Sequence, residues 1–150
     1  MEIFTLLEAL EDILERSKTV PFTEKSITKY AEPFVGGGAV LFDILSKYDL
    51  EEVYISDINA ELMNTYSVIR DDIDALIKIL YTMQNEFIPL DADKRKLYYN
   101  KTRDRFNNLK DKGNENISIE KAALMIFLNK TCFNGLFRVN RKGAFNVPMG

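Results

Sequence analysis

The sequence contains no histidine, no tryptophan and a single cysteine, Cys132. One cysteine can form neither an intrachain disulfide nor a structural zinc site. The lack of histidine excludes Ser-His-Asp catalysis, Cys-His catalysis and any His-ligated zinc. We therefore expect no metal centre in this chain and a fold that is stabilised by its hydrophobic core.

No stretch approaches the roughly 18 consecutive apolar residues that a membrane-spanning helix needs. Glu2 and Glu8 stand where a signal peptide would carry basic residues. We therefore expect a cytoplasmic protein without a membrane segment. The 150 residues are 46% hydrophobic and 29% charged, a composition that permits one compact domain with a real core.

Acidic residues are absent from residues 121–150, which contain five basic residues. This segment carries +5, so with the whole chain at −3 the first 120 residues carry −8. The overall excess of acid argues against a protein that binds polyanions through its bulk charge. The uneven distribution instead indicates an anionic partner for the C-terminal segment.

The first 70 residues carry the signals of a βαβ unit. Apolar residues recur at helical spacing in residues 3–16, which predicts an amphipathic helix. After a polar connector, the predicted elements are a strand at 30–35, a helix at 39–47, a strand at 52–56, and a helix that is capped by Asp57 or Asn59 and ends near residue 70. This order of elements is typical of a doubly wound α/β fold.

Residues 71–150 are predicted to form a helical region that ends in a loop. Apolar residues repeat at helical spacing in 72–86 and, more sparsely, in 91–110. Ser118 is expected to open a further helix with an incomplete capping box, and residues 131–150 to form a loop and hairpin. One βαβ unit supplies only two strands, so we also expect an incomplete sheet whose exposed edge favours self-association.

The glycine turn Glu-Pro-Phe-Val-Gly-Gly-Gly at 32–38 is the main candidate ligand site. Glycines at the end of a strand permit a tight turn and the close approach of a ligand to the backbone. A Walker-type phosphate loop is excluded, because Ala39 and Val40 follow the glycines in place of Lys and Ser or Thr. A dinucleotide fingerprint would need glycine where Leu41 stands, and Glu32 would repel a pyrophosphate.

S-adenosylmethionine fits this turn better. Asp57 lies about twenty residues beyond the turn, at the end of the next predicted strand, where a carboxylate meets a ribose diol in nucleotide-binding βαβ units. The ligand has no phosphate, and its cationic amino and sulfonium groups tolerate Glu32. Three plainer interpretations stay open: a merely flexible glycine turn, a solvated Glu32, and an Asp57 that only caps a helix.

Three segments carry motifs that go beyond a general nucleotide-binding fold. They are Glu-Pro-Phe-Val-Gly-Gly-Gly-Ala-Val at 32–40, Ser-Asp-Ile-Asn at 56–59, and Asn-Gly-Leu-Phe-Arg-Val-Asn followed by Gly-Ala-Phe-Asn-Val-Pro-Met-Gly within 134–150. Together they resemble the Dam-type (D12 class) DNA adenine-N6 methyltransferases over residues 30–150. The resemblance implies transfer of a methyl group from S-adenosylmethionine to the exocyclic amine of an adenine that is flipped out of duplex DNA.

The resemblance also implies a fold, a partial Rossmann-like methyltransferase core of the α/β class with an inserted helical DNA-recognition region. Residues 1–70 would then hold the N-terminal helix and the partial cofactor-binding unit, and residues 71–150 the target-recognition region. The residues that match the family's cofactor site are Glu32, Pro33, Phe34, Gly36, Gly38, Asp57 and Ile58. Asp57 matches the ribose-binding acid, and Ile58 the neighbour of the adenine ring.

The family's DNA-reading residues match positions in the C-terminal loop. Phe133, with Asn134 beside it, falls where an aromatic side chain enters the base stack near the flipped nucleotide. Leu136 and Pro148 fall where apolar side chains meet a thymine methyl. Arg138 falls where an arginine reads a guanine edge, which implies a GATC-like site.

Two further basic residues, Arg141 and Lys142, match contacts to phosphates, which position a protein on DNA without reading its sequence. The residue chemistry alone leaves plainer alternatives. Phe133 and Leu136 could equally be core residues, and the basic residues could belong to a solvated hairpin.

Two motifs of the family have no match in residues 1–150. An N-terminal Trp-Ala-Gly-Gly-Lys type segment is absent, and Phe22 to Lys25 is at best a remnant of it. The motif Asp-Pro-Pro-Tyr is absent too, and in the family its Asp orients the adenine amine while its Tyr stacks on the flipped base. No catalytic residue is therefore assigned, and we expect a fragment that binds the cofactor weakly and is inactive alone.

Two other functions stay open at this point. A non-catalytic remnant would bind duplex DNA through residues 131–148 without performing chemistry. A dinucleotide-dependent enzyme would bind NAD in place of S-adenosylmethionine, although Leu41 disfavours it. Titration of the chain with each cofactor and with DNA separates these possibilities.

Overall fold

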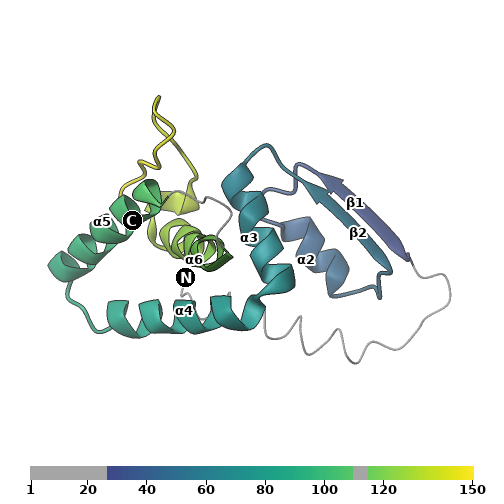
Figure 1. The fold of residues 1–150 in the computed structure, drawn as a ribbon, viewed down its shortest axis with the longest axis horizontal. Helices are drawn as coiled ribbons and strands as arrows, with labels where there is room; N and C mark the ends of the chain where they lie inside the picture. Colours follow the sequence, from purple (N-terminus) through teal and green to yellow (C-terminus); the bar gives the residue numbers. More distant parts are fainter. Residues whose placement is uncertain (1–26, 110–114) are drawn as a thin grey trace. The chain divides into compact units, whose positions relative to one another are not determined.

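The computed structural model describes residues 27–109 and 115–150 and, for residues 115–117, the backbone alone (Figure 1). The helix predicted at 3–16 and the segment Phe22 to Lys25 lie outside the described residues. The described chain forms two compact units, which divide between Met63 and Asn64.

The first unit is a βαβ arrangement. Its elements are the strand β1 (Lys29–Pro33), the helix α2 (Ala39–Leu45) and the strand β2 (Glu52–Ser56). The two strands pair in parallel, with Glu32 opposite Ile55, and a parallel pair needs a crossover connection such as α2. Within the described residues the sheet has these two strands, so the prediction of an α/β arrangement is confirmed.

The first strand ends two residues earlier than predicted. Phe34 has a φ of 67°, which lies in the left-handed region and turns the chain out of the strand after Pro33. Val35 is nevertheless buried, and its N–H donates to the carbonyl oxygen of Ser56 at 3.0 Å. The apolar run of residues 30–35 thus contains the start of the glycine turn as well as a strand.

Helices dominate the second unit. Its elements are α3 (Ala60–Asp71), which begins before the division between the units, α4 (Ile73–Phe87), α5 (Ala92–Asn108), α6 (Glu115–Thr131) and a short 3₁₀ turn η1 (Phe133–Gly135). The helices predicted at 72–86 and 91–110 are confirmed. The predicted start of α6 at Ser118 is wrong, because no glycine or proline between Glu115 and Ser118 stops the helix.

The core of this unit is built around α6. Ala122, Ala123 and Phe127 of this helix are fully buried. The Phe127 ring lies edge-on to the rings of Phe87 in α4, at 5.1 Å between centroids, and Tyr98 in α5, at 5.6 Å. A helix that neighbours cover on several sides has little need of a polar face, which explains the continuous apolar run from Ala122 to Leu128.

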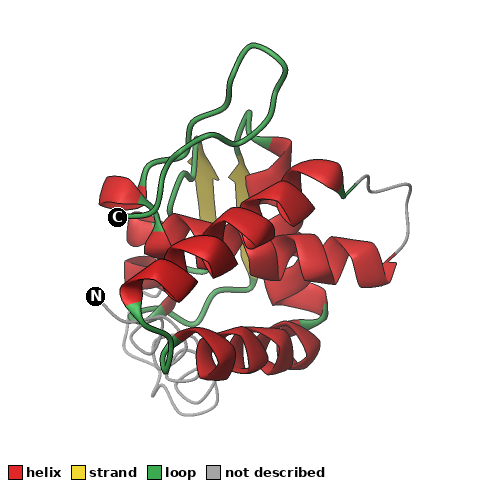
Figure 2. Cartoon of the chain, turned by 90° about the vertical axis from the view of Figure 1, so that its left-hand side faces the viewer, coloured by secondary structure: helices red, strands yellow, loops and turns green. Residues whose placement is uncertain are grey.

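The C-terminal segment forms the predicted loop and hairpin, which extends beyond the helices of its unit as the long loop at the top of Figure 2. An antiparallel bridge joins Val139 to Phe145. The turn between them is closed by Asn140, whose Oδ1 accepts the N–H groups of Lys142 at 2.8 Å and Ala144 at 3.1 Å. Among the described helices, none is both long and apolar enough to cross a membrane.

Candidate functional site

The carboxylate of Asp57 joins the end of β2 to the glycine turn. Its Oδ2 accepts the N–H of Gly36 at 3.0 Å, and its Oδ1 accepts the N–H of Asn59 at 2.9 Å. The bonds from Asn59 and Gly36 lower the pKa of Asp57, because they stabilise the charged form. Asp57 is therefore ionised and held in a fixed orientation at neutral pH.

The helix after β2 is capped by Asn59 and not by Asp57. The Asn59 Oδ1 accepts the N–H groups of Glu61 at 3.1 Å and Leu62 at 3.3 Å, as an N-cap side chain does. Asp57 is thus left to bind the turn. A carboxylate has about four lone-pair positions, so after two backbone bonds it can still accept hydrogen bonds from the two hydroxyls of a ribose.

The glycine turn itself contains unusual backbone angles. Phe34, Gly36 and Gly38 have φ values of 67°, 52° and 75°. Gly38 opens α2 in the left-handed conformation without a side-chain cap, and its N–H donates to the Val35 carbonyl at 2.9 Å. Glycine adopts such angles without cost, whereas Phe34 does not, so the conformation of Phe34 is strained.

Apolar side chains flank this turn and are exposed. The Phe34 side chain is 80% exposed and that of Ile58 is 95% exposed, and Pro33 is exposed as well. These residues lie at or just after the carboxyl ends of two adjacent parallel strands, which is where ligands bind in open α/β sheets. Their exposure and the fixed Asp57 carboxylate suit a ligand with a flat ring and a vicinal diol.

Glu32 is half-buried on β1 and accepts a hydrogen bond from the Tyr30 hydroxyl at 2.8 Å. Desolvation and this bond to Glu32 raise the pKa of Tyr30. Glu32 is thus partly covered and hydrogen-bonded at the end of β1, and the alternative of a solvated acid stays open. Its carboxylate keeps acceptor capacity for a cationic group.

All seven candidate DNA-binding residues are exposed on the segment that follows α6. They are Phe133, Asn134, Leu136, Arg138, Arg141, Lys142 and Pro148. Phe133 is 53% exposed and Leu136 is 48% exposed, so the alternative that they are core residues is wrong. Arg141 and Lys142 lie in the turn of the hairpin. The seven cofactor candidates lie in the first unit and the seven DNA candidates in the second.

Sequence reasoning missed the residues that hold this loop in place. Tyr99 and Asn107 of α5 and Asn146 of the hairpin all make hydrogen bonds to it. Tyr99 was not among the apolar positions expected for this helix. Asn107 is a polar residue on the same charged helix, so nothing in the sequence distinguished it from a solvated side chain.

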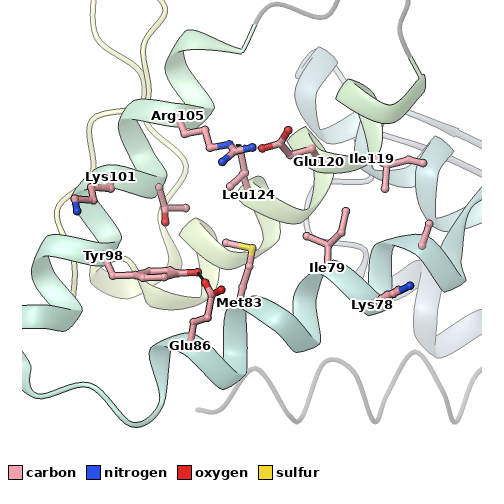
Figure 3. Close-up of a pocket in the computed structure, with 12 residues that line it drawn as sticks. Lys78, Ile79, Met83, Glu86, Tyr98, Lys101, Arg105, Ile119, Glu120 and Leu124 are labelled. Atoms are coloured by element: carbon pink, nitrogen blue, oxygen red, sulfur yellow. Dashed lines mark hydrogen bonds and ion pairs between the residues drawn. The ribbon is translucent and has the colours of Figure 1, made fainter.

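A separate cavity of about 670 Å³ lies between α4, α5 and α6 (Figure 3). Its apolar wall includes Met83 and Leu124, while Tyr98 donates to Glu86 at 2.9 Å and Arg105 forms an ion pair with Glu120. None of the candidate residues from the sequence lines it. In the described part of the chain, no group of three or more His, Cys, Asp or Glu residues could hold a metal ion.

Residues 5–150 match the family model of the D12 class N6 adenine-specific DNA methyltransferases. The chain belongs to this family.

Curated relatives agree with this assignment. The type II methyltransferase M.MjaIII of Methanocaldococcus jannaschii is 51% identical over 137 residues, which are 91% of this chain and 46% of that protein. The type II methyltransferase M1.LlaDCHI of Lactococcus lactis is 37% identical over 81% of this chain and 38% of its own length, and the DNA adenine methylase of Vibrio cholerae is 34% identical over 79% and 38%. The chain thus spans less than half the length of these relatives.

Proposed function

We propose that this chain is the cofactor-binding and DNA-recognition part of a DNA adenine-N6 methyltransferase that uses S-adenosylmethionine and acts at a GATC-like site in duplex DNA. The proposal depends on one observation in a chain of this family. The Asp57 carboxylate is ionised, and a hydrogen bond from the Gly36 N–H holds it beside the glycine turn. In a partial Rossmann-like core, such a group marks the ribose position of the cofactor.

The cofactor, when bound, supplies an electrophilic methyl group. In this proposal Asp57 accepts hydrogen bonds from the ribose hydroxyls, and Phe34 and Ile58 cover apolar parts of the nucleoside. Glu32 attracts the cationic amino acid end. Gly36 and Gly38 let the ligand approach the backbone closely, and Pro33 lies beside the ligand at the end of β1.

The loop after α6 is the proposed DNA-reading surface. Phe133 enters the base stack beside Asn134, Leu136 and Pro148 contact a thymine methyl, and Arg138 reads a guanine. Arg141 and Lys142 at the turn of the hairpin bind phosphates. The absence of acidic residues after residue 120 supports this assignment, because no carboxylate on that segment repels the DNA backbone.

We further propose that residues 1–150 alone do not methylate DNA. Methyl transfer requires a group that orients the adenine amine and stabilises its developing positive charge. The sequence contains no Asp-Pro-Pro-Tyr, and none of the assigned residues has this role.

Calorimetric titration with S-adenosylmethionine tests the cofactor site. Wild type is expected to bind, Asp57→Ala to bind on the order of 10- to 100-fold more weakly, and Asp43→Ala to bind as wild type does. Asp43 is a matched control, because it lies in the same unit and pairs with Lys47 on the surface. Equal affinity of wild type and Asp57→Ala, or binding of NAD instead, would overturn the proposal.

A non-catalytic DNA-binding remnant is the second candidate, favoured by the exposed loop after α6, where residues 121–150 carry five basic and no acidic residues. It predicts DNA binding that is independent of S-adenosylmethionine, and no cofactor binding by the chain. The same titration, repeated with a GATC duplex, separates the two candidates.

A further inference from the structure

Helix α5 holds the loop that carries the proposed DNA-reading residues. The side chain of Asn107 bonds both backbone groups of Phe145. Its Nδ2 donates to the Phe145 carbonyl at 3.0 Å, and its Oδ1 accepts the Phe145 N–H at 2.8 Å. This one side chain makes the two backbone hydrogen bonds that a neighbouring strand would otherwise make at this edge of the hairpin.

A second hydrogen bond fixes the same strand two residues further on. The hydroxyl of Tyr99, which is fully buried in α5, donates to the Val147 carbonyl at 2.8 Å. Burial raises the pKa of Tyr99 to about 12, so the hydroxyl keeps its proton at any physiological pH. The Phe145 ring is also buried and lies edge-on to Phe106 of α5 at 6.2 Å.

The residue between these two anchored positions is Asn146, and it holds Arg138. The Arg138 Nε donates to Asn146 Oδ1 at 2.8 Å, and its Nη2 donates to the Asn146 carbonyl at 3.3 Å. The Asn146 N–H donates in turn to the Arg138 carbonyl at 3.1 Å. A guanidinium has five N–H donors, so three remain for another acceptor pair such as a guanine edge.

We propose that Asn107 and Tyr99 are positioning residues for DNA recognition, which set the orientation of Arg138 through Asn146. This inference rests on the proposed function of the loop. It predicts that loss of these residues affects sequence-specific and non-specific DNA binding differently. Contact with phosphates depends mainly on charge, whereas bidentate reading of a base depends on side-chain geometry. Loss of the hydrogen bonds from Asn107 and Tyr99, which we call the anchor, should therefore reduce affinity for the cognate sequence more than affinity for non-specific DNA.

Binding of a GATC duplex and of a duplex with the same composition in scrambled order tests this difference. Asn107→Ala is expected to lose about tenfold in affinity for the GATC duplex, with a much smaller loss for the scrambled one, since one or two hydrogen bonds typically account for such a factor. Tyr99→Phe, which removes only the hydroxyl, should show the same pattern more weakly. Asn108→Ala is the matched control, because Asn108 is exposed on the same helix.

Hydrogen exchange provides a readout that does not depend on DNA. In Asn107→Ala, the amides of Phe145 and Asn146 should exchange faster, whereas the amides in the middle of α6 should remain as protected as in wild type. Unchanged exchange of these two amides, or equal losses of affinity for both duplexes, would overturn the inference. If wild type shows no preference for GATC while the hairpin amides still loosen in Asn107→Ala, the anchor stands and the DNA-reading assignment fails.

Discussion

Two polar residues that follow β2, Asp57 and Asn59, have different roles. The sequence left open which of them caps the helix, because both are good N-cap residues. The structure assigns the cap to Asn59 and leaves the Asp57 carboxylate bound to the glycine turn. The choice depends on three-dimensional proximity to Gly36, which lies 21 residues earlier in the chain and which local propensity cannot register.

The lowered pKa of Asp57 predicts a pH dependence. A carboxyl group whose pKa is lower in the folded state contributes stability above its unfolded pKa of about 3.9, and that contribution is lost as the pH falls through the folded value. As the pH falls through this lowered pKa, we expect the glycine turn to loosen. The amide shift of Gly36, followed by NMR, should titrate with a midpoint below 3.8, the ordinary value.

Asp57→Asn is the control for this titration. The Gly36 amide should then show no transition in the same window. A midpoint at or above the ordinary value in wild type would contradict the hydrogen-bonded geometry.

The strained conformation of Phe34 gives a second prediction at this scale. Phe34→Gly and Phe34→Ala both remove the exposed ring, but only glycine removes the penalty of a positive φ. We expect the glycine variant to be more stable than the alanine variant by about 1 kcal/mol in urea unfolding. Both should bind S-adenosylmethionine more weakly than wild type. An alanine variant of equal or greater stability would show that residue 34 is not strained.

At the scale of elements, the spacing of apolar residues predicted helices and a strand that the structure confirms. The helices at 72–86 and 91–110 and the strand at 52–56 were found close to their expected bounds, because apolar spacing reports the buried face directly. The C-terminal loop was predicted from its glycine and asparagine content. Its anchors on α5 could not be, because the bonds from Asn107 and Tyr99 join residues 38 and 48 positions apart.

The central position of α6 yields a stability prediction. Phe127 is fully buried and contacts aromatic rings from both α4 and α5. Phe127→Ala should lower the free energy of unfolding by about 3–5 kcal/mol, because it leaves a cavity where three helices meet. Urea unfolding followed by circular dichroism measures this loss.

Leu97→Ala serves as the control for the core variant, since Leu97 lies on α5 and is 55% exposed. Its loss of stability should be small. Comparable losses in the two variants would mean that α6 does not organise the helical unit.

At the scale of the whole molecule, the small sheet is the feature most prone to pair with other chains. The described sheet has two strands, and both Val53 and Tyr54 of β2 are exposed, at 39% and 64%. Two strands are fewer than a stable open sheet normally has, and strand edges without partners pair readily with other chains. The relatives are more than twice as long as the matched segment, so a longer protein has residues available to cover such edges.

The exposed sheet predicts concentration-dependent self-association of residues 1–150. Sedimentation velocity at increasing concentration should show a growing fraction of dimers or larger species. Val53→Lys should reduce this fraction, because a charged side chain on an edge strand opposes pairing between copies. Val40→Lys is the matched control, since Val40 is 55% exposed on α2 and lies outside the sheet. A chain that stays monomeric throughout, or an equal effect of both lysine variants, would rule out association through the sheet.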